Sequence, residues 1–428
     1  ALLAGMKELK EVTAIKEVRS LTAAMFPGTH CPLMGAAMAV RGIRDAVILL
    51  VGTDECAYYA KHMTLHSEDF GGLSGRCLSV VLDAHDVTFG CRPKLEAAFA
   101  ELAEEYKPKA VFLVTTCVIE VIGDDVDSLA DALAESYGIP VLPVHTEHFK
   151  CENHLPGLTR TLTACFELME RVPCDGRVNL LGQRMGRFET TELSQVLRDA
   201  GVSIGLQLPC GCDIRDIREA GAAKVNIVVN DIALPLAEKM KNAFDIPYVF
   251  FDKFTAPSNI LRAYEDLFRH LDLPLPAQVR TLHQTAMEAV RKGAPMLSGV
   301  TYIYGNTPFQ VFEFNRFMAE LGMVPQLIQT AAIEAEDREN IDAILRASDP
   351  YVTKTANIAP LQYVYGVLKP QLYLGHEYAL RLRQKGIALV RTDGAGGMLG
   401  FEVTPYVLKA LTQAVEEARS LRREEVAL

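Results

Sequence analysis

Three cysteines occupy positions where a protein built of alternating strands and helices places its chemistry. Cys117 follows an apolar, β-branched run, 110–116, that predicts a buried strand. Cys56 follows a second such run, 46–51, and Cys31 lies in a turn with Gly and Pro that opens a predicted helix. Because open α/β sheets bind ligands at the carboxyl ends of their parallel strands, we expect the three thiols to converge on one point.

Three converging thiols indicate a metal site, because thiolates are soft ligands suited to iron–sulfur clusters. Such clusters are ordinarily held by four cysteines, so three in one chain leave a ligand missing. We therefore expect a partner chain or a second copy of this chain to supply the remainder, which places the cluster at a subunit interface. The alternative is that these cysteines are small buried hydrophobic residues. Three ligands alone do not define the type of cluster.

The composition is that of a soluble globular protein, with 49% hydrophobic and 23% charged residues. The 428 residues exceed what one core usually holds. A net charge of -11 argues against nucleic-acid binding. No apolar run approaches the roughly 20 residues that cross a bilayer, and residues 1–21 mix Lys, Glu and Arg instead of forming a signal peptide. We expect a cytoplasmic protein whose ten cysteines are free thiols or metal ligands.

The order of predicted strands and helices indicates an α/β fold with three doubly wound, Rossmann-like domains and parallel sheets. The first predicted domain, 1–175, contains the three cysteines. The second covers 176–298 and includes a proline-rich linker, 272–279. The third, 299–428, closes with a helix over about 405–423.

Two other groups of residues offer metal ligands at short spacing. One group has a possible metal ligand at every third position and comprises His145, His148, Cys151 and His154. These residue types would suit zinc, although the spacing is tight for ligands within one loop. The other is the pair Cys210 and Cys212, in a loop that is expected to face the cleft between domains. The pair could bind metal or substrate.

A glycine-rich segment, 393–400, follows a predicted strand and precedes a helix, as a phosphate-binding turn does. Two features speak against a dinucleotide site here: the glycines come at the last crossover, and no acidic residue ends a following strand. The sequence also contains no GxxxxGK[ST] motif. Any dependence on ATP must therefore come from another protein.

Around the three cysteines the chain resembles the nitrogenase component 1 family. The resemblance rests on five pieces in order: CPLMGA from Cys31, VGTDEC ending at Cys56, VTFGCRPKL from Val87, TTCVIEVIGDD from Thr115 and PVLPVHTE from Pro140. It covers roughly the first third of the chain in detail. The other two thirds are similar mainly in their layout of strands and helices.

This resemblance implies that Cys31, Cys56 and Cys117 ligate an iron–sulfur cluster shared with a partner subunit, either an eight-iron P-cluster type or a 4Fe-4S cluster. It also implies a homologous α-type partner in an α2β2 heterotetramer and a homodimeric, ATP-hydrolysing iron–sulfur reductase protein that delivers electrons. Family α-type subunits anchor a larger cofactor by a cysteine and a histidine. This chain has Asn230 at the first place and no histidine in 393–400. We therefore expect the larger cofactor in the partner, and no catalytic acid or base can be named.

The function that follows from the resemblance is that of a β-type subunit of a nitrogenase-like, two-component, ATP-dependent oxidoreductase acting on a small molecule. The substrate that we favour is a methylthio-alkane, whose C–S bond would be cleaved reductively. One alternative is a nitrogenase β-subunit proper or a subunit of protochlorophyllide or chlorophyllide reductase. A second is a non-catalytic scaffold on which a nitrogenase-type cofactor is assembled, and a third is a nucleotide-binding α/β protein without iron.

Overall fold

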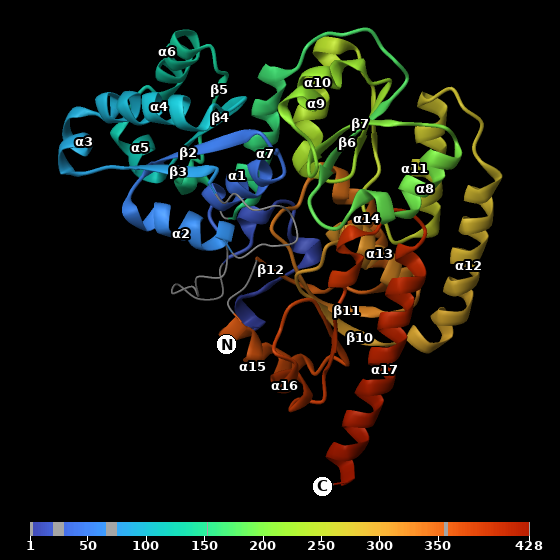
Figure 1. Ribbon diagram of the computed structural model, residues 1–428. Coiled ribbons are helices and arrows are strands. Elements are labelled where there is room, and N and C mark those ends of the chain that lie inside the picture. Colours follow the sequence, from blue (N-terminus) through green and yellow to red (C-terminus); the bar gives the residue numbers. More distant parts are fainter. Residues whose placement is uncertain (1–2, 20–29, 66–74, 152, 355–357, 428) are drawn as a thin grey trace.

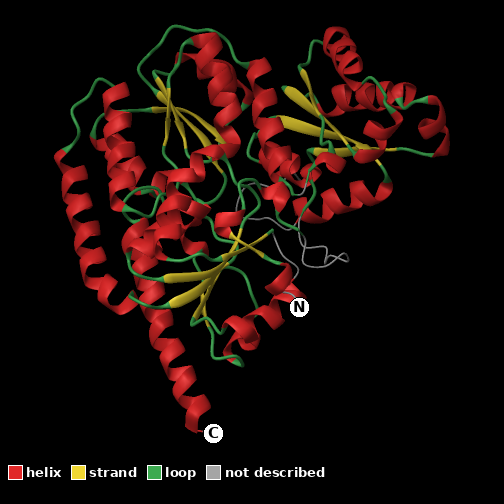
Figure 2. Ribbon diagram, turned by 180° about the vertical axis from the view of Figure 1, so that it is seen from behind, coloured by secondary structure: helices red, strands yellow, loops and turns green. Residues whose placement is uncertain are grey.

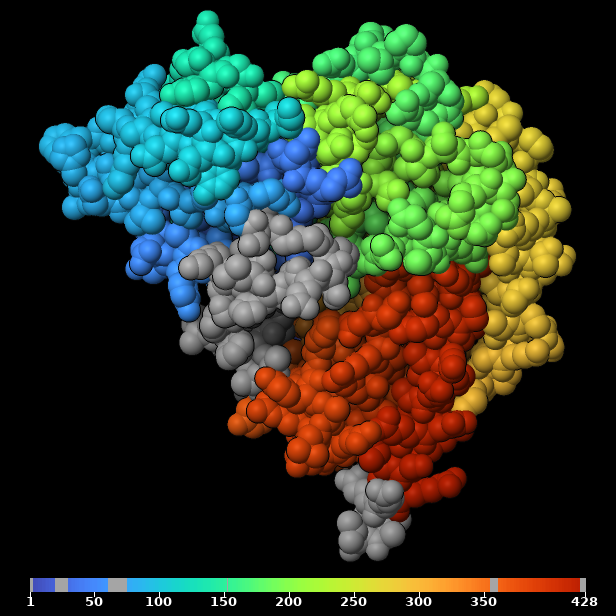
Figure 3. Space-filling model, viewed as in Figure 1, coloured from blue at the N-terminus to red at the C-terminus, as the bar shows by residue number. Residues whose placement is uncertain are grey.

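The computed structural model describes residues 3–19, 30–65, 75–151, 153–354 and 358–427. Its strands form three separate sheets, each flanked by helices (Figures 1 and 2). We call each sheet with its helices a lobe. The expected α/β fold with three doubly wound domains is confirmed. In the space-filling view the first lobe (blue to teal), the second (green) and the third (orange to red) lie against one another (Figure 3).

The first lobe has a four-stranded parallel sheet in the order β3-β2-β4-β5. Its strands are β2 (Ala46–Gly52), β3 (Cys77–Val81), β4 (Ala110–Thr115) and β5 (Val141–Val144). Its helices are α1 (Pro32–Arg41), α2 (Asp54–Leu65), α3 (Ala84–Phe89), α4 (Arg92–Tyr106), α5 (Cys117–Ile122), α6 (Val126–Tyr137) and α7 (Leu155–Ala164). Every residue of β2 and β4 is buried, as expected for central strands covered on both faces.

The second lobe repeats this topology, with the parallel order β7-β6-β8-β9. Its strands are β6 (Val178–Gln183), β7 (Ile204–Pro209), β8 (Val225–Val228) and β9 (Tyr248–Phe250). Its helices are α8 (Glu192–Asp199), α9 (Ile214–Arg218), α10 (Leu234–Phe244) and α11 (Pro257–His270). In both lobes the second strand in sequence lies on one side of the first strand, and the third strand lies on its other side. The ligand sites of doubly wound sheets lie at this switch point.

The third lobe has six strands in the order β1-β12-β11-β10-β13-β14. They are β1 (Lys7–Glu8), β10 (Thr301–Tyr304), β11 (Val324–Gln329), β12 (Tyr351–Thr353), β13 (Leu372–Leu374) and β14 (Ala388–Val390). Its helices are α13 (Val311–Glu320), α14 (Arg338–Ala347), α15 (Ile358–Leu368), α16 (Ala379–Arg383) and α17 (Val403–Ala427). All neighbouring strands are parallel except β1, which pairs antiparallel to β12.

The position of β1 differs from the prediction that the first domain begins at residue 1. Leu9 and Val12, just after β1, are fully buried in the core of the third lobe. The edge of β12 offers unpaired backbone groups, and β1 satisfies them from the far end of the sequence. Such a pairing over more than three hundred residues leaves no trace in the local pattern. The predicted boundaries near residues 175 and 298 remain predictions.

One long helix was missed between the second and third lobes. The proline-rich segment 272–279 was expected to be a linker, but α12 (Ala277–Leu297) begins within it. This helix packs along α17 (Figure 1), and a Cβ added to Gly293 would lie 3.3 Å from a methyl group of Leu408. Its buried residues, Val279, Ala286, Gly293 and Leu297, form one stripe along the helix, as in an amphipathic helix. Strand β12 and helix α15 were also not predicted.

Candidate functional site

The three cysteines singled out by sequence all lie at the beginning of a helix. Cys31 is the N-cap residue of α1, Cys56 is in the first turn of α2, and Cys117 is the first residue of α5. Strands β2 and β4 are neighbours, with Val51 opposite Thr115, so α2 and α5 start from adjacent strand ends. This is the switch point of the first sheet, the position expected for a ligand site.

Cys56 is electrostatically coupled to both Cys31 and Cys117, and we call these three residues the cysteine trio. All three are free thiols and partly buried. Burial raises the pKa of Cys31 and of Cys117, and the Cys56 thiol raises both pKa values further. An electrostatic effect of this kind requires proximity, so Cys56 lies near both of the others. The backbone N–H groups of Leu33 and Met34 oppose the rise in the pKa of Cys31, as expected at a helix N-terminus, which favours thiolates.

The spacing of the trio suits a cluster better than a single ion. Among the described residues only one group, Asp83 with His85 and Asp86, places three ligand atoms within 4.8 Å of one another, and the trio is not such a group. Thiolates around one ion would be that close. A cluster of several irons holds its thiolates farther apart, because iron and sulfide lie between them. Three thiols are, as a donor set, chemically suited to an iron–sulfur cluster.

Close backbone packing fixes the turn that carries Cys31. A Cβ added to Gly35 of α1 would lie 2.0 Å from the carbonyl oxygen of His154, and one added to Gly157 of α7 would lie 1.8 Å from that of Pro32. Helices α1 and α7 therefore approach each other as only glycine allows. His30, just before the trio's first member, hydrogen-bonds through its ring Nδ1 to the hydroxyl of Tyr59 on α2. These contacts tie the start of α1 to both α2 and α7.

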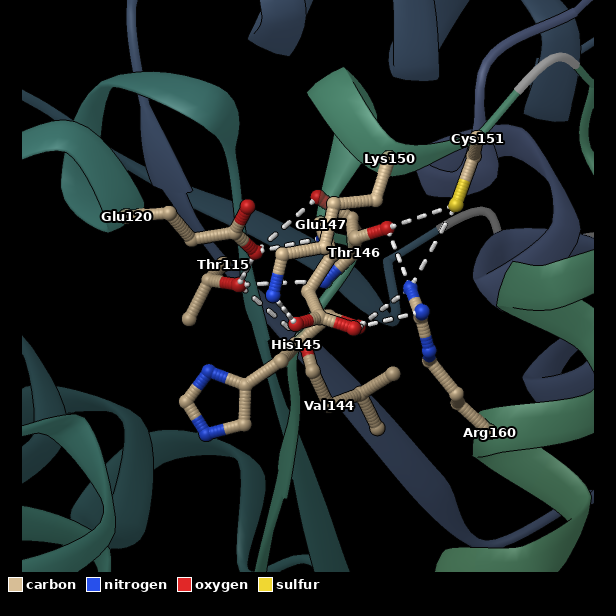
Figure 4. A network of polar contacts seen from close by, with 9 residues as sticks. All are labelled: Thr115, Glu120, Val144, His145, Thr146, Glu147, Lys150, Cys151 and Arg160. Atoms are coloured by element: carbon tan, nitrogen blue, oxygen red, sulfur yellow. Dashed lines mark hydrogen bonds and ion pairs between the residues drawn. The ribbon is translucent and has the colours of Figure 1, made fainter.

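A polar network holds the start of α5, and with it Cys117 (Figure 4). The Glu120 carboxylate accepts hydrogen bonds from the Thr115 hydroxyl at 2.7 Å, the Thr146 hydroxyl at 3.3 Å and the Glu147 backbone N–H at 2.8 Å. Sequence reasoning missed this network. Its only signal is a carboxylate inside the otherwise apolar stretch CVIEVI.

Glu147 extends the network to α7. Its backbone has φ 43°, a left-handed conformation that a residue with a side chain adopts only with support. The support comes from two ion pairs of the Glu147 carboxylate, with the Lys150 ammonium at 2.6 Å and the Arg160 guanidinium at 2.5 Å. The hydrogen bond from Lys150 is the main cause of the lowered pKa of Glu147. Arg160 also donates to the carbonyl oxygen of Thr146 at 2.6 Å. The loop after β5 is thus fastened to the helix that carries Cys117.

Replacing Glu120 by alanine should loosen this arrangement. Three donors lose their acceptor, so we expect a loss of about 1.5 to 3 kcal/mol in the free energy of unfolding, with weaker retention of any metal at Cys117. Urea denaturation and iron analysis measure the two effects. Glu104→Ala, at an exposed position of α4, is the control. Equal stability of both variants would show that the network does not hold α5.

An apolar surface lies beside the trio. A cavity of about 330 Å³ is lined by α5 and the loop after β5, with apolar residues such as Ile119 and Phe149 beside the charged residues Glu120, Asp124, Glu147 and Lys150. Val121 at its rim is 69% exposed, and Phe149 is 75% exposed. Phe89 ends α3, which contacts α5, and is 76% exposed. We call Phe89, Val121 and Phe149 the apolar face. Exposed apolar side chains on neighbouring elements are typical of a surface that binds a partner.

The zinc alternative is not supported by the geometry. The ring Nε2 of His145 lies 2.9 Å from a carboxylate oxygen of Asp127. The Cys151 thiol donates to the carbonyl oxygen of Thr146 at 3.7 Å. The ring of His154 faces that of His30. Within the part of the chain that the structure describes, these residues form no three-ligand group.

The single three-ligand group that the described residues do contain has a structural explanation. Asp83 is the N-cap residue of α3 and accepts hydrogen bonds from the backbone N–H groups of His85 and Asp86. The Lys94 ammonium lies 2.7 Å from Asp86 and 3.3 Å from Asp83. The lysine therefore already offsets one of the two negative charges.

The other two candidates from sequence also have packing roles. Cys212 is 1% exposed in a hydrophobic core, whereas Cys210 is only partly buried. In the glycine-rich segment, a Cβ added to Gly186 would lie 2.7 Å from the Cα of Gly397, and one added to Gly400 would lie 2.4 Å from Glu192 Oε1. These glycines allow the second and third lobes to pack closely, which argues against a phosphate-binding turn.

The fold and the placed cysteines define a three-lobed, doubly wound α/β protein with a thiol site at the switch point of its first sheet. The sequence model of the family described as nitrogenase component 1 type oxidoreductase matches residues 31–395. The chain therefore belongs to this family, as the sequence motifs predicted. Members typically bind iron–sulfur clusters and generally assemble as α/β heterotetramers that work with a reductase partner.

Curated relatives carry two kinds of name. The chain is 31% identical over 223 residues to the nitrogenase iron-molybdenum cofactor biosynthesis protein NifE of Clostridium pasteurianum, covering 51% of this chain and 49% of the relative. It is 24% identical to a nitrogenase molybdenum-iron protein alpha chain of Methanosarcina barkeri, and the match covers 68% of this chain and 58% of the relative. The chain thus spans about half the length of these relatives.

A solved structure described as nitrogenase Cp1 at pH 6.5 has the same fold. It matches with a TM-score of 0.77 over 93% of this chain and 94% of the other, at 16% identity. Among the described residues, no helix is both long and apolar enough to span a membrane.

Proposed function

We propose that the chain is the cluster-binding subunit of a nitrogenase component 1 type complex that serves as a scaffold for assembly of a nitrogenase-type metal cofactor. The observation that carries the proposal is the cysteine trio: three partly buried thiols at helix starts, gathered at the switch point of one sheet. The role as a scaffold is supported by relatives named for cofactor biosynthesis. This role was an alternative to the catalytic subunit that the sequence favoured.

Cys31, Cys56 and Cys117 would hold the iron–sulfur cluster, with the remaining ligands from a partner subunit. Bound there, the cluster supplies one-electron transfer at a potential that burial and hydrogen bonds set. The protein's part is to keep the thiols in place. Contacts between α1 and α7 position Cys31, and the Glu120 network positions Cys117.

A larger cofactor would lie in the partner. In this chain Asn230, at the place of the family's anchoring cysteine, caps a turn by accepting a hydrogen bond from the backbone N–H of Ile232 at 3.3 Å. The glycine-rich segment 393–400 packs against the second lobe instead of presenting a side-chain ligand. Both places have structural roles here.

The second candidate function is a catalytic subunit of a nitrogenase-like reductase. The apolar face favours it, because an electron-delivering partner that docks there would lie beside Cys117. Cleavage of the C–S bond of methylthio-alkanes remains a prediction about the substrate.

One experiment separates the two candidates. The chain is purified without oxygen together with its partner subunit, and the complex is tested in two assays. Transfer of an iron–sulfur cofactor that restores a cofactor-free nitrogenase supports the scaffold. Turnover of a methylthio-alkane with the reductase protein and ATP, without such transfer, contradicts it and supports the catalytic subunit. A complex without iron contradicts both.

The apolar face gives a further prediction. Replacing Phe89 by serine should weaken ATP-dependent electron delivery by the reductase protein about tenfold or more, since large aromatic side chains at the centre of interfaces contribute the most. The readout is the rate of cluster reduction at several concentrations of reductase. Tyr363→Ser, at a 75% exposed position of the third lobe, is the control. Equal rates for both variants would place the docking surface elsewhere.

A further inference from the structure

Two carboxylates meet where the second lobe packs on the third. Glu192 is the first residue of α8, and Glu402 lies directly before α17. The Glu192 carboxylate accepts the backbone N–H groups of Phe401 at 2.8 Å and of Glu402 at 3.0 Å. In return, the Glu402 carboxylate accepts the backbone N–H groups of Glu192 at 3.2 Å and of Leu399 at 2.9 Å. Each lobe thus supplies an acceptor for N–H groups at the start of a helix in the other.

The glycine-rich segment 393–400 makes this contact possible. A Cβ added to Gly400 would lie 2.4 Å from Glu192 Oε1 and 2.9 Å from the Tyr264 hydroxyl oxygen, so only glycine leaves room for the carboxylate. The Tyr264 hydroxyl donates a hydrogen bond to the same Glu192 oxygen at 2.9 Å. The end of the segment that resembled a phosphate-binding turn is therefore bound by a carboxylate from the neighbouring lobe.

The Glu192 carboxylate is partly buried beside that of Glu402. Burial is the main reason why the pKa of Glu192 rises to about 7, and the charge of Glu402 adds to the rise. The hydrogen bonds from Phe401, Tyr264 and the backbone of Glu402 oppose the rise, because they favour the ionised form. Within the described residues neither carboxylate forms an ion pair. Glu192 therefore gains its charge near neutral pH.

A rise in pH weakens this contact. When the two lobes separate here, the Glu192 carboxylate becomes hydrated and its pKa returns to the ordinary value of 4.5. Between about pH 4.5 and 7 the closed contact therefore binds a proton more readily than the open one. The stabilising effect of this proton is complete below that range, is lost as the pH rises through it, and is absent above about pH 7.

Two further titratable groups face the contact. Tyr264 on α11 is fully buried, and burial beside Glu192 raises the pKa of its hydroxyl, so it remains a neutral donor. His283 on α12 contacts the ring of Phe401, with ring centroids 5.6 Å apart. Because histidine side chains in general titrate between pH 5 and 8, an experiment has to separate His283 from Glu192.

We propose that Glu192 and Glu402 form a pH-sensitive latch between the second and third lobes, which opens more readily in neutral than in mildly acidic solution. The latch consists of these two carboxylates and the N–H groups that they bind at the starts of α8 and α17. The inference does not depend on the proposed function, because the cysteine trio lies in the first lobe and the latch needs no metal.

The test measures amide hydrogen exchange of the full chain by mass spectrometry between pH 5 and 8, with each rate divided by that of an unstructured peptide at the same pH. In the wild type, protection of the peptide containing 399–402 should fall about tenfold or more between pH 5 and 7.5. The start of α6 is the internal control. Its cap, Asp125, has a pKa that hydrogen bonds from Ser128 lower, so it stays charged over this range.

Three variants assign the effect. Glu192→Gln cannot gain a charge, so protection at 399–402 should no longer depend on pH. Glu402→Gln removes the neighbouring charge but keeps the Glu192 carboxylate, so the fall in protection should become smaller and end at a lower pH. His283→Asn should respond to pH as the wild type does.

Three results would overturn the proposal. One is constant protection of 399–402 in the wild type, and another is a fall that persists in Glu192→Gln. The third is a fall that His283→Asn abolishes. Should Glu192→Gln fail to fold, Glu402→Gln decides: a smaller fall supports the latch, and a fall equal to that of the wild type contradicts it.

Discussion

Replacing Cys56 by alanine is expected to reduce the iron in the purified complex by about tenfold or more, together with loss of its visible absorbance. Cys56 is the member of the trio that lies near both others. Because metal–thiolate bonds supply much of the binding free energy of such sites, the remaining two thiols should not retain the cluster. Iron analysis and electron paramagnetic resonance of the anaerobically purified complex measure the effect.

Two controls accompany this variant. Cys174→Ala removes an exposed thiol before the second lobe, and Cys77→Ala removes a half-buried thiol on β3. Both should keep the iron of the wild type. Circular dichroism distinguishes loss of iron from loss of fold. A folded Cys56→Ala complex with its full iron content would show that the trio is not the ligand set, and the proposed function would fail with it.

Replacing Glu313 by alanine is expected to have the largest effect on stability. Glu313 lies on α13 of the third lobe and is 5% exposed. Its carboxylate accepts the backbone N–H groups of Thr255 and Ala256 at 3.0 Å each, the Thr255 hydroxyl at 2.8 Å and the Asn259 amide at 2.9 Å. It thereby caps the start of α11 in the second lobe. The variant leaves several buried donors unpaired, so we expect a loss of about 3 to 5 kcal/mol in the free energy of unfolding.

Urea denaturation measures this loss. Glu320→Ala on the same helix is the matched control, because its ion pair with Arg316 is partly exposed and such pairs contribute about 0 to 1 kcal/mol. Glu313→Gln keeps the shape but replaces one acceptor by a donor, so an intermediate loss is expected. A Glu313→Ala protein as stable as Glu320→Ala would mean that this contact between lobes does not contribute to stability.

Elements with strong local signals were predicted well. Helix α6 has such signals at both ends, because Asp125 caps its start by accepting the backbone N–H of Ser128 and Gly138 ends it at φ 65°. The strands that lead to Cys56 and Cys117 were likewise recognised from buried, β-branched runs. In contrast, α12 and β1 depend on partners far along the chain. Strand β1 has only two residues and therefore carries no pattern of its own.

The sequence by itself determined the family, through the motifs around its cysteines, and the three-lobed α/β fold, because hydrophobic periodicity and the parallel-sheet rule act over short stretches of chain. Tertiary structure alone decided which polar groups find a partner. Glu120 and Glu313 are satisfied by donors from other elements. Hydrogen bonds and ion pairs depend on distances of a few ångströms between segments that lie far apart in sequence, and only the folded chain sets those distances.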